Sequence, residues 1–116
     1  GGGANIKFGS VSWMVKVGGM PVYTTCKSAA QGLTRSLARD FGPHHIRVNT
    51  VVPGWVMTEK QLRLWVTPQA KIELAKAQCL PGELSPADLA RAVLFLASDA
   101  SSMMTVQDLV IDGGWT

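Results

Sequence analysis

The stretch Ile46-Arg47-Val48-Asn49-Thr50-Val51-Val52, followed by Pro53-Gly54, decides the fold. Its apolar and β-branched residues run with little interruption from Val48 to Val52, which is typical of a strand covered on both faces. Pro53 and Gly54 end the strand, since proline cannot donate to a sheet and glycine favours a turn. Strands buried in this way belong mostly to parallel sheets with helices on both sides, so the segment predicts an α/β protein.

The residues before this strand predict one further strand and one long helix. Residues 1–3 are glycines and predict a loop, and apolar and polar residues then alternate over Asn5–Phe8, as in a short strand. A loop with Gly18-Gly19 leads into a helix predicted over Tyr23–Phe41. Apolar residues recur along it at intervals of three and four, which predicts the buried stripe Cys26, Ala30, Leu33, Leu37 and Phe41.

The residues after the strand predict three helices and a last strand. The helices are expected over residues 59–65, 69–78 and from Ser85 to about Ala97, and the strand over 109–111. Thr67-Pro68 and Ser85-Pro86 each place a capping side chain before a proline at the first helical position. The buried stripe of the last helix is predicted to be Leu89, Val93, Leu96 and Ala97.

This order of elements predicts a small parallel sheet with right-handed crossovers. Residues 1–116 form a single domain without a repeat or a linker. Three strands are too few to close such a layer by themselves. The fold class is therefore α/β, with the chain resembling half of a larger Rossmann-like doubly wound sheet.

Composition narrows the function classes. The 116 residues are 47% hydrophobic and 16% charged, as in a globular domain with an apolar core. The net charge of +3 is modest and the basic residues are scattered, which argues against a nucleic-acid partner. Cys26 and Cys79 lack metal-ligand spacing and are expected to be free, buried thiols in a reducing compartment, the cytoplasm. No stretch has the pattern of a signal peptide or the length of a membrane span, so no membrane partner is expected.

Tyr23-Thr24-Thr25-Cys26-Lys27 is the first candidate catalytic motif. Tyr23 and Lys27 are four residues apart and share one face of a helix. A nearby cation favours a phenolate over a phenol, so the pair could take up and release a proton near neutral pH. Ser10, thirteen residues before the tyrosine, could hold a substrate oxygen against it. An ordinary surface pair on a helix has the same spacing, so the motif depends on its context.

That context resembles the C-terminal half of the short-chain dehydrogenase/reductase family over essentially the whole chain. The matching motifs are Ser10, Tyr23 and Lys27 at the family spacing, Arg47-Val48-Asn49 before Val52-Pro53-Gly54, Thr58, Leu94-Phe95-Leu96-Ala97-Ser98-Asp99, and the terminal Asp112-Gly113-Gly114. Each motif is weak by itself, and together and in order they are specific. The resemblance implies a Rossmann-type enzyme that uses NAD or NADP and assembles as a homo-oligomer.

The resemblance also assigns roles to residues. Tyr23 would be the general acid/base, Lys27 would favour its phenolate form and bind the nicotinamide ribose hydroxyls, and Ser10 would position the substrate oxygen. The other residues that would border the nicotinamide or bond its carboxamide or a phosphate are Pro53, Gly54, Val56 and Thr58. The cofactor itself would supply the hydride chemistry.

The chain departs from the family pattern in four respects. It has no Gly-rich turn of the kind that holds pyrophosphate, and no counterpart of the family's upstream active-site asparagine. Lys7 stands where many relatives have Asn, and Val106 stands where relatives usually have Gly. Relatives are roughly twice as long, as two mononucleotide-binding halves require. The N-terminal dinucleotide-binding half is thus expected to be absent, and the chain to be a fragment or to need a partner half.

The substrate is suggested by a closer resemblance to aldose 1-dehydrogenases of the xylose or arabinose type. It rests on Ser10-Val11-Ser12-Trp13, the segment 33–40 and Ala77-Gln78-Cys79-Leu80. Trp13 and Trp55 are predicted substrate contacts, because indole faces pack on the C–H faces of sugars. Ser12, the second serine, is expected either to form hydrogen bonds within the loop or to contact the substrate. Trp65 and Trp115 could also line a sugar site; alternatively Trp55 and Trp65 pack a lid helix and Trp115 lies in a subunit contact.

These observations predict an NAD(P)-dependent oxidoreductase acting on a small molecule, either a secondary alcohol or ketone or a sugar hemiacetal. One alternative is a ketoreductase of the acyl-carrier type, which shares the same catalytic residues. A second alternative is a catalytically silent assembly module, whose long helix and last strand form oligomer contacts. His44 and His45 lie between a helix end and a strand, where a solvated turn is expected and a metal site is not.

Overall fold

A computed structural model describes residues 2–116, and its centre is a sheet of three strands. The strands β1 (Gly3–Phe8), β2 (Ile46–Pro53) and β3 (Asp108–Ile111) lie in the order β1-β2-β3. Both pairings are parallel, as the sequence predicts. The prediction of a loop at Gly3 is wrong, because its N–H donates to the carbonyl of His45 at 3.2 Å and extends β1; Gly1 lies outside the described residues.

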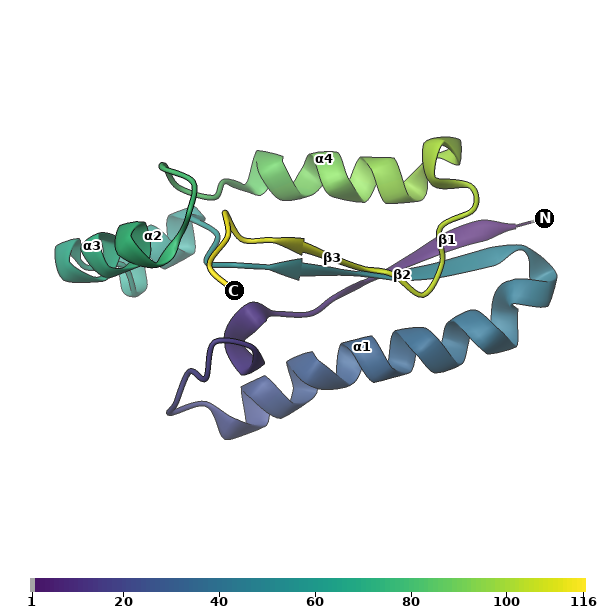
Figure 1. Cartoon of the computed structure of the whole chain (residues 1–116), viewed down its shortest axis with the longest axis horizontal. Coiled ribbons are helices and arrows are strands. Elements are labelled where there is room, and N and C mark those ends of the chain that lie inside the picture. The colour runs from purple at the N-terminus through teal and green to yellow at the C-terminus, as the bar shows by residue number, and fades with distance from the viewer. Residues whose placement is uncertain (1) are drawn as a thin grey trace.

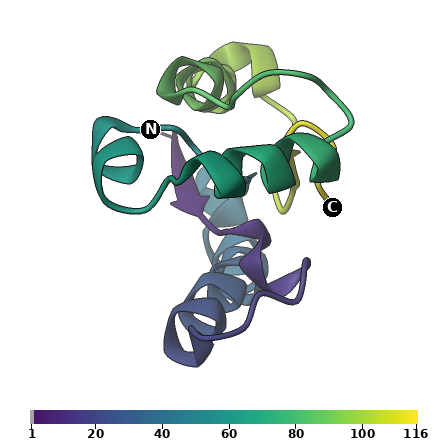
Figure 2. The same ribbon diagram turned by 90° about the vertical axis from the view of Figure 1, so that its left-hand side faces the viewer.

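Helices cover both faces of the sheet. The elements are α1 (Pro21–Phe41), α2 (Glu59–Leu64), α3 (Pro68–Ala77) and α4 (Pro86–Ala97), with 3-10 turns η1 (Val11–Trp13), η2 (Gly42–His44) and η3 (Asp99–Ser101). Figure 1 shows α1 along one face of the sheet and α4 along the other, with α2 and α3 beyond one end of the strands. Figure 2 looks onto that end. The molecule is thus one part of a doubly wound sheet.

Helix starts follow the predicted caps. The Thr67 hydroxyl accepts a hydrogen bond from the N–H of Ala70 at 3.1 Å, and Ser85 with Asp88 forms a complete capping box. Helix α1 begins at Pro21, two residues before the predicted Tyr23, because a proline suits the first turn of a helix. The sequence therefore places these helices correctly, with their ends within two residues of the observed ones.

The core lies under β2, but α1 meets it with a different face from the predicted stripe. Val51 and Val52 are fully buried. Of the predicted stripe, Cys26, Leu33 and Phe41 are exposed and Ala30 and Leu37 are half-buried, whereas the buried residues of α1 are Thr34 and Ala38. Small side chains let the helix axis approach the sheet closely, so the larger apolar side chains face outward.

Two other burial predictions are wrong. Cys26 and Cys79 are both free, as predicted, but both are exposed. Cys26 shares the outward face of α1, and Cys79 follows the end of α3, where its Sγ contacts the carbonyl of Gly114 at 3.3 Å. In α4, Leu96 is fully buried and Ala97 is exposed, because the helix ends there and turns away from the sheet.

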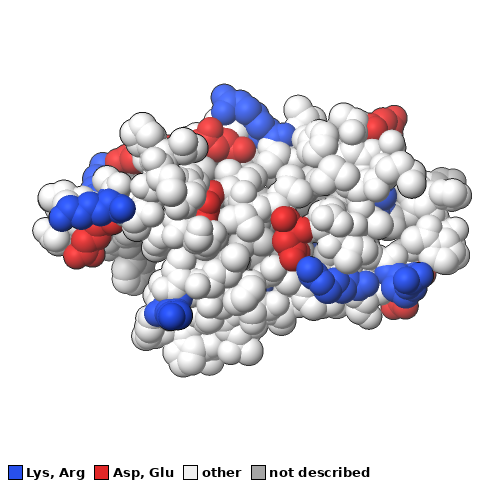
Figure 3. Space-filling view, in the orientation of Figure 1, with Lys and Arg blue, Asp and Glu red and all other residues white. Residues whose placement is uncertain are grey.

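Charge is spread thinly over the surface. On the face drawn in Figure 3, Lys, Arg, Asp and Glu stand singly or in small groups, and most of the surface is uncharged.

No helix in residues 2–116 is both long and apolar enough to cross a membrane.

Candidate active site

A cleft of about 480 Å³ lies at the end of the sheet where β1 and β2 run into loops. Ligands of open α/β sheets bind at the carboxyl ends of the strands, which is where this cleft lies. Its lining residues are Ser10, Val11, Ser12, Val17, Met20, Tyr23, Gly54, Trp55, Gln61, Trp65 and Trp115. The cleft therefore draws its walls from five separate parts of the chain.

Ser10 is fixed at the exit of β1. The preceding Gly9 donates its N–H to the carbonyl of Val51 at 2.8 Å, which ties this end of β1 to β2. Ser10 is 9% exposed, and its Oγ accepts a hydrogen bond from the N–H of Ser12 at 3.1 Å. It thereby caps η1, and the hydroxyl is held at the cleft wall by backbone on both sides.

Tyr23 and Lys27 share one face of α1, as their spacing predicts. Tyr23 is 46% exposed and lines the cleft, and the Lys27 Nζ lies 5.8 Å from the centroid of its ring. That distance is within the range of a cation–π contact. The same ammonium donates to the carbonyl oxygen of Phe8 at 3.5 Å, near the end of β1. Lys27 therefore joins the end of β1, two residues before Ser10, to the helix that carries Tyr23.

Ser12 carries a hydroxyl without a partner. The residue is 6% exposed and lines the cleft, and its Oγ is buried with no hydrogen bond within residues 2–116. A buried hydroxyl of this kind costs free energy unless something bonds to it. A polar ligand in the cleft would be a suitable partner.

Gly54 forms the wall below β2. Its N–H donates to the carbonyl of Ile111 at 2.9 Å, and a Cβ at this position would lie 2.8 Å from the Cβ of Asp112. Only glycine allows this approach. Because Gly54 has no side chain, backbone alone forms this part of the wall, next to Pro53, the last residue of β2.

Asp112 holds the last residues of the chain against the site. Its carboxylate accepts hydrogen bonds from the N–H of Gly114 at 2.8 Å and from the N–H and hydroxyl of Thr116 at 2.9 and 2.8 Å. Burial by itself would raise the pKa of Asp112, but these hydrogen bonds outweigh it, and the pKa lies below its usual value. The turn they form brings Trp115 into the cleft wall.

Five predicted site residues do not line the cleft. Two of them adjoin lining residues, since Lys27 contacts the ring of Tyr23 and Pro53 directly precedes Gly54. Trp13, predicted near the substrate, is 39% exposed and lies outside the lining. The Thr58 hydroxyl caps α2 by accepting the N–H of Gln61 at 3.2 Å, and Val56 forms a bridge with Leu84. Both residues follow β2 closely, at the border of the site.

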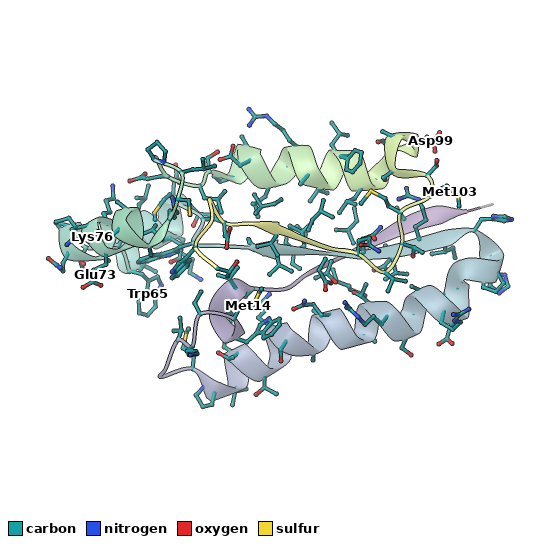
Figure 4. The ribbon with its side chains drawn as sticks, in the orientation of Figure 1. Met14, Trp65, Glu73, Lys76, Asp99 and Met103 are labelled. Atoms are coloured by element: carbon teal, nitrogen blue, oxygen red, sulfur yellow. The ribbon has the colours of Figure 1, made fainter. Side chains whose placement is uncertain are left out.

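Gln61 is a polar lining residue that the sequence did not lead us to expect. The indole Nε1–H of Trp55 donates to its Oε1 at 2.9 Å. A signal was present, because Thr58 and Gln61 have the spacing of a capping box. Trp65 and Trp115, which the sequence left open, both line the cleft. Figure 4 shows Trp65 below α2, on the side of the sheet that carries Met14 and α1.

Residues 2–116 contain no cluster of side chains that could ligate a metal. Within this range no group of three or more His, Cys, Asp or Glu side chains is placed to hold a metal ion. The arrangement has instead two serine hydroxyls, a phenol and an ammonium around a cleft with three indole walls, which suits proton transfer to or from a small polar molecule.

Comparison with known proteins gives matches over the full length of this chain. Residues 1–116 match the family described as Enoyl-(Acyl carrier protein) reductase. The chain is 47% identical over 115 residues to the D-xylose 1-dehydrogenase of Caulobacter vibrioides, covering 99% of the chain and 46% of that protein. It is 44% identical to a "Probable galactose dehydrogenase" of Rhizobium meliloti, covering 98% of the chain and 44% of the relative. The chain thus spans less than half the length of these relatives.

Solved structures agree with the sequence matches. A short-chain type dehydrogenase/reductase from Mycobacterium ulcerans superposes with a TM-score of 0.93 at 29% identity, covering 99% of this chain and 42% of that one. A 7α-hydroxysteroid dehydrogenase complexed with NADH and 7-oxo glycochenodeoxycholic acid gives 0.92 at 34% identity, covering 98% and 44%. Fold, motif order and sequence identity agree: the chain belongs to the short-chain dehydrogenase/reductase family.

Proposed function

We propose that this chain is the C-terminal half of an NAD- or NADP-dependent oxidoreductase that oxidises the hemiacetal of an aldose. The observation that supports this most is the meeting of Ser10 and Tyr23 in one cleft, with Lys27 tied to both of their elements. These contacts all lie within residues 2–116, so this half would supply the serine, tyrosine and lysine of the proton transfer.

In this reaction the sugar hydroxyl loses a proton while its carbon loses a hydride, and the C–O bond becomes a double bond. Tyr23 takes up the proton at its phenolic oxygen in oxidation and returns it in reduction. The Ser10 hydroxyl donates to the same substrate oxygen and stabilises charge there. Lys27 stabilises the phenolate by its positive charge. The nicotinamide, when bound, accepts or supplies the hydride.

The residues beside the cleft fit the nicotinamide end of such a cofactor. A Cβ at Gly54 would clash with Asp112, so glycine lets the loop after β2 pack against the final turn, and Pro53 and Val56 would border the nicotinamide beside it. Among the described residues the Lys27 ammonium makes a single long hydrogen bond, of 3.5 Å, and keeps donors for ribose hydroxyls. The Thr58 hydroxyl accepts one bond and can still donate to a carboxamide or a phosphate.

The pyrophosphate and the second ribose would be held elsewhere. No G-x-G-x-x-G turn joins a strand to a helix in residues 2–116. We assign that role to the other half of the enzyme, in keeping with the coverage of less than half of each relative. The choice between NAD and NADP belongs to the contacts of that half.

An aldose is favoured over an acyl-carrier ketoester by three observations. The relatives with 47% and 44% identity are sugar dehydrogenases by name, whereas the similarity to a 3-oxoacyl-[acyl-carrier-protein] reductase from Chlamydia pneumoniae is 37%. The cleft is walled by Trp55, Trp65 and Trp115, and indole faces pack well against the C–H faces of sugar rings. Ser12 offers a free hydroxyl to the same ligand.

The test uses a segment-swapped enzyme, in which this chain replaces the 115 matched residues of the Caulobacter vibrioides D-xylose 1-dehydrogenase. We expect turnover of aldoses with NAD or NADP, and loss of at least about 100-fold in Tyr23→Phe, in line with the contribution of a general acid/base. Thermal unfolding should be unchanged in the variant. Turnover that survives Tyr23→Phe, or a swapped enzyme that reduces β-ketoacyl esters and no aldose, would contradict the proposal.

We also propose a homo-oligomer and a cytoplasmic enzyme. The outward face of α1 carries Val22 and Leu33 at 75% and 48% exposure, and Phe41 at the end of the helix is 42% exposed, so an apolar surface suited to a second copy lies along α1. Sedimentation of the swapped enzyme tests the oligomer, and Leu33→Glu is the variant that should dissociate it.

The cytoplasm is proposed because free, exposed cysteines suit a reducing compartment.

A further inference from the structure

Gln61 differs from the other polar residues of the cleft in how it is held. It lies on α2, is half-buried and lines the same cleft as Ser10 and Tyr23. Its backbone N–H donates to the Thr58 hydroxyl at 3.2 Å, and its side-chain Oε1 accepts from the Trp55 indole at 2.9 Å. Both ends of the residue are therefore fixed before any ligand arrives.

The Trp55 contact also determines which way the amide faces. An indole N–H can only donate, so the carbonyl oxygen of Gln61 must be the atom that meets it. The amide nitrogen Nε2 then points away from Trp55. No hydrogen bond within residues 2–116 uses this nitrogen, and it is not among the buried polar atoms that lack a partner. Two N–H donors thus remain accessible at the cleft wall.

We propose that Gln61 is a specificity-determining residue, which donates from Nε2 to one hydroxyl or ring oxygen of the aldose. The inference rests on the proposed function and deepens it, because it assigns recognition of a second sugar oxygen away from the reacting carbon. Trp55 is the positioning residue that presents the amide. A pre-organised donor loses little freedom on binding, which makes it effective in discriminating between hydroxyl patterns.

The experiment measures kcat/KM of the segment-swapped enzyme for D-xylose and for the series of its monodeoxy analogues. For Gln61→Leu we expect a loss of roughly 3- to 10-fold on D-xylose, carried mainly by KM, which is the size of one neutral hydrogen bond. For one analogue, the one that lacks the bonded hydroxyl, the variant and the parent should differ by less than about twofold. If Gln61 donates to the ring oxygen instead, the variant and the parent should agree on the carbocyclic analogue of D-xylose, which lacks that oxygen.

Two further variants keep the test decisive. Trp55→Phe keeps an aromatic wall and removes the N–H, so it should reduce discrimination in the same analogue as Gln61→Leu. Gln69→Leu is the matched control, because Gln69 lies on α3 outside the cleft and its side chain bonds only to Glu73, at 3.4 Å, within residues 2–116. It should leave all the kinetic constants unchanged.

Equal losses on D-xylose and on every analogue, in a variant that melts like the parent, would overturn the role of Gln61. The role of Gln61 would also be overturned if Trp55→Phe had the kinetic constants of the parent and Gln61→Leu discriminated between the analogues as the parent does. These outcomes are distinct from failure of the proposed function, in which the swapped enzyme turns over no aldose or ignores Tyr23→Phe.

Discussion

The hydroxyls of Thr34 and Thr50 lie 2.7 Å apart, one in the middle of α1 and the other in the middle of β2. Both side chains are fully buried. Their hydrogen bond fixes the height of α1 along the sheet. The positions of Tyr23 and Lys27 therefore depend on a polar contact in the core, about three turns beyond Tyr23 and two turns beyond Lys27 along the helix.

Replacing Thr34 by Val should expose the cost of breaking this contact. The two side chains have similar volume, so the loss is the buried hydroxyl of Thr50 left with one partner fewer, about 1–2 kcal/mol. In the segment-swapped enzyme the melting temperature should fall by roughly 2–8 °C. In a double-mutant cycle, Thr34→Val with Thr50→Val should cost less than the sum of the single variants. Additive losses would show that the two hydroxyls do not stabilise one another.

The backbone conformation of Val106 leads us to expect that glycine at this position stabilises the fold. The residue has φ +68°, in the left-handed region that is unfavourable for a β-branched residue, and its N–H donates to the carbonyl of Val48 at 2.8 Å. Val106→Gly relieves this strain but costs some conformational entropy, because glycine is more flexible in the unfolded chain. The net effect should be to stabilise the fold by about 1 kcal/mol. Val110→Gly, in the extended backbone of β3, should destabilise it. Thermal unfolding of both variants measures the contrast, and a lower melting temperature in Val106→Gly would refute the strain.

Gly54 and Gly32 should respond in opposite directions to the same substitution. Gly54→Ala places a Cβ 2.8 Å from Asp112 and should destabilise the enzyme by roughly 1–3 kcal/mol and weaken nicotinamide binding. Gly32 lies within α1, and a Cβ there would meet no neighbouring atom within 4 Å, so Gly32→Ala should stabilise by about 0.5–1 kcal/mol. Melting curves and NADH titration measure both effects. Equal affinity for NADH in Gly54→Ala would separate this wall from the cofactor site.

Asp112 should contribute to stability at neutral pH and not in acid. Its pKa in the folded chain lies below the ordinary value, so the folded state binds fewer protons than the unfolded state. The contribution is complete above about pH 4 and is lost as the pH falls through the folded pKa. The melting temperature of the parent should thus fall more steeply below about pH 4 than that of Asp112→Asn. Parallel curves for the two proteins would contradict this linkage.

The sequence predicted the order of strands and helices because local signals are strong there. Alternation marks β1, the apolar run marks β2, and Thr67, Ser85 and Pro68 mark helix starts. It also predicted that Ser10 and Tyr23 act together, from their spacing and the family resemblance, and both residues line one cleft. These features depend on neighbours in the chain, which a sequence displays directly.

Burial on α1 could not be predicted in the same way. Periodicity selected Leu33 and Phe41, yet the sheet receives Thr34 and Ala38. A sequence shows which residues are apolar, but it does not show which apolar face meets this sheet and which is left for another surface. The contact between Trp55 and Gln61 was missed for a related reason, because it depends on how the loop after β2 turns into α2.

The position of β1 at the edge of the sheet has a practical consequence. Within residues 2–116 its one hydrogen-bonded neighbour is β2, and Phe8 at its end is 46% exposed. An open strand edge beside apolar side chains is a template on which a second chain can add a strand. Recombinant production of the 116 residues without the other half should therefore yield inclusion bodies or fibrils, and co-expression with the complementary half should bring the protein into the supernatant.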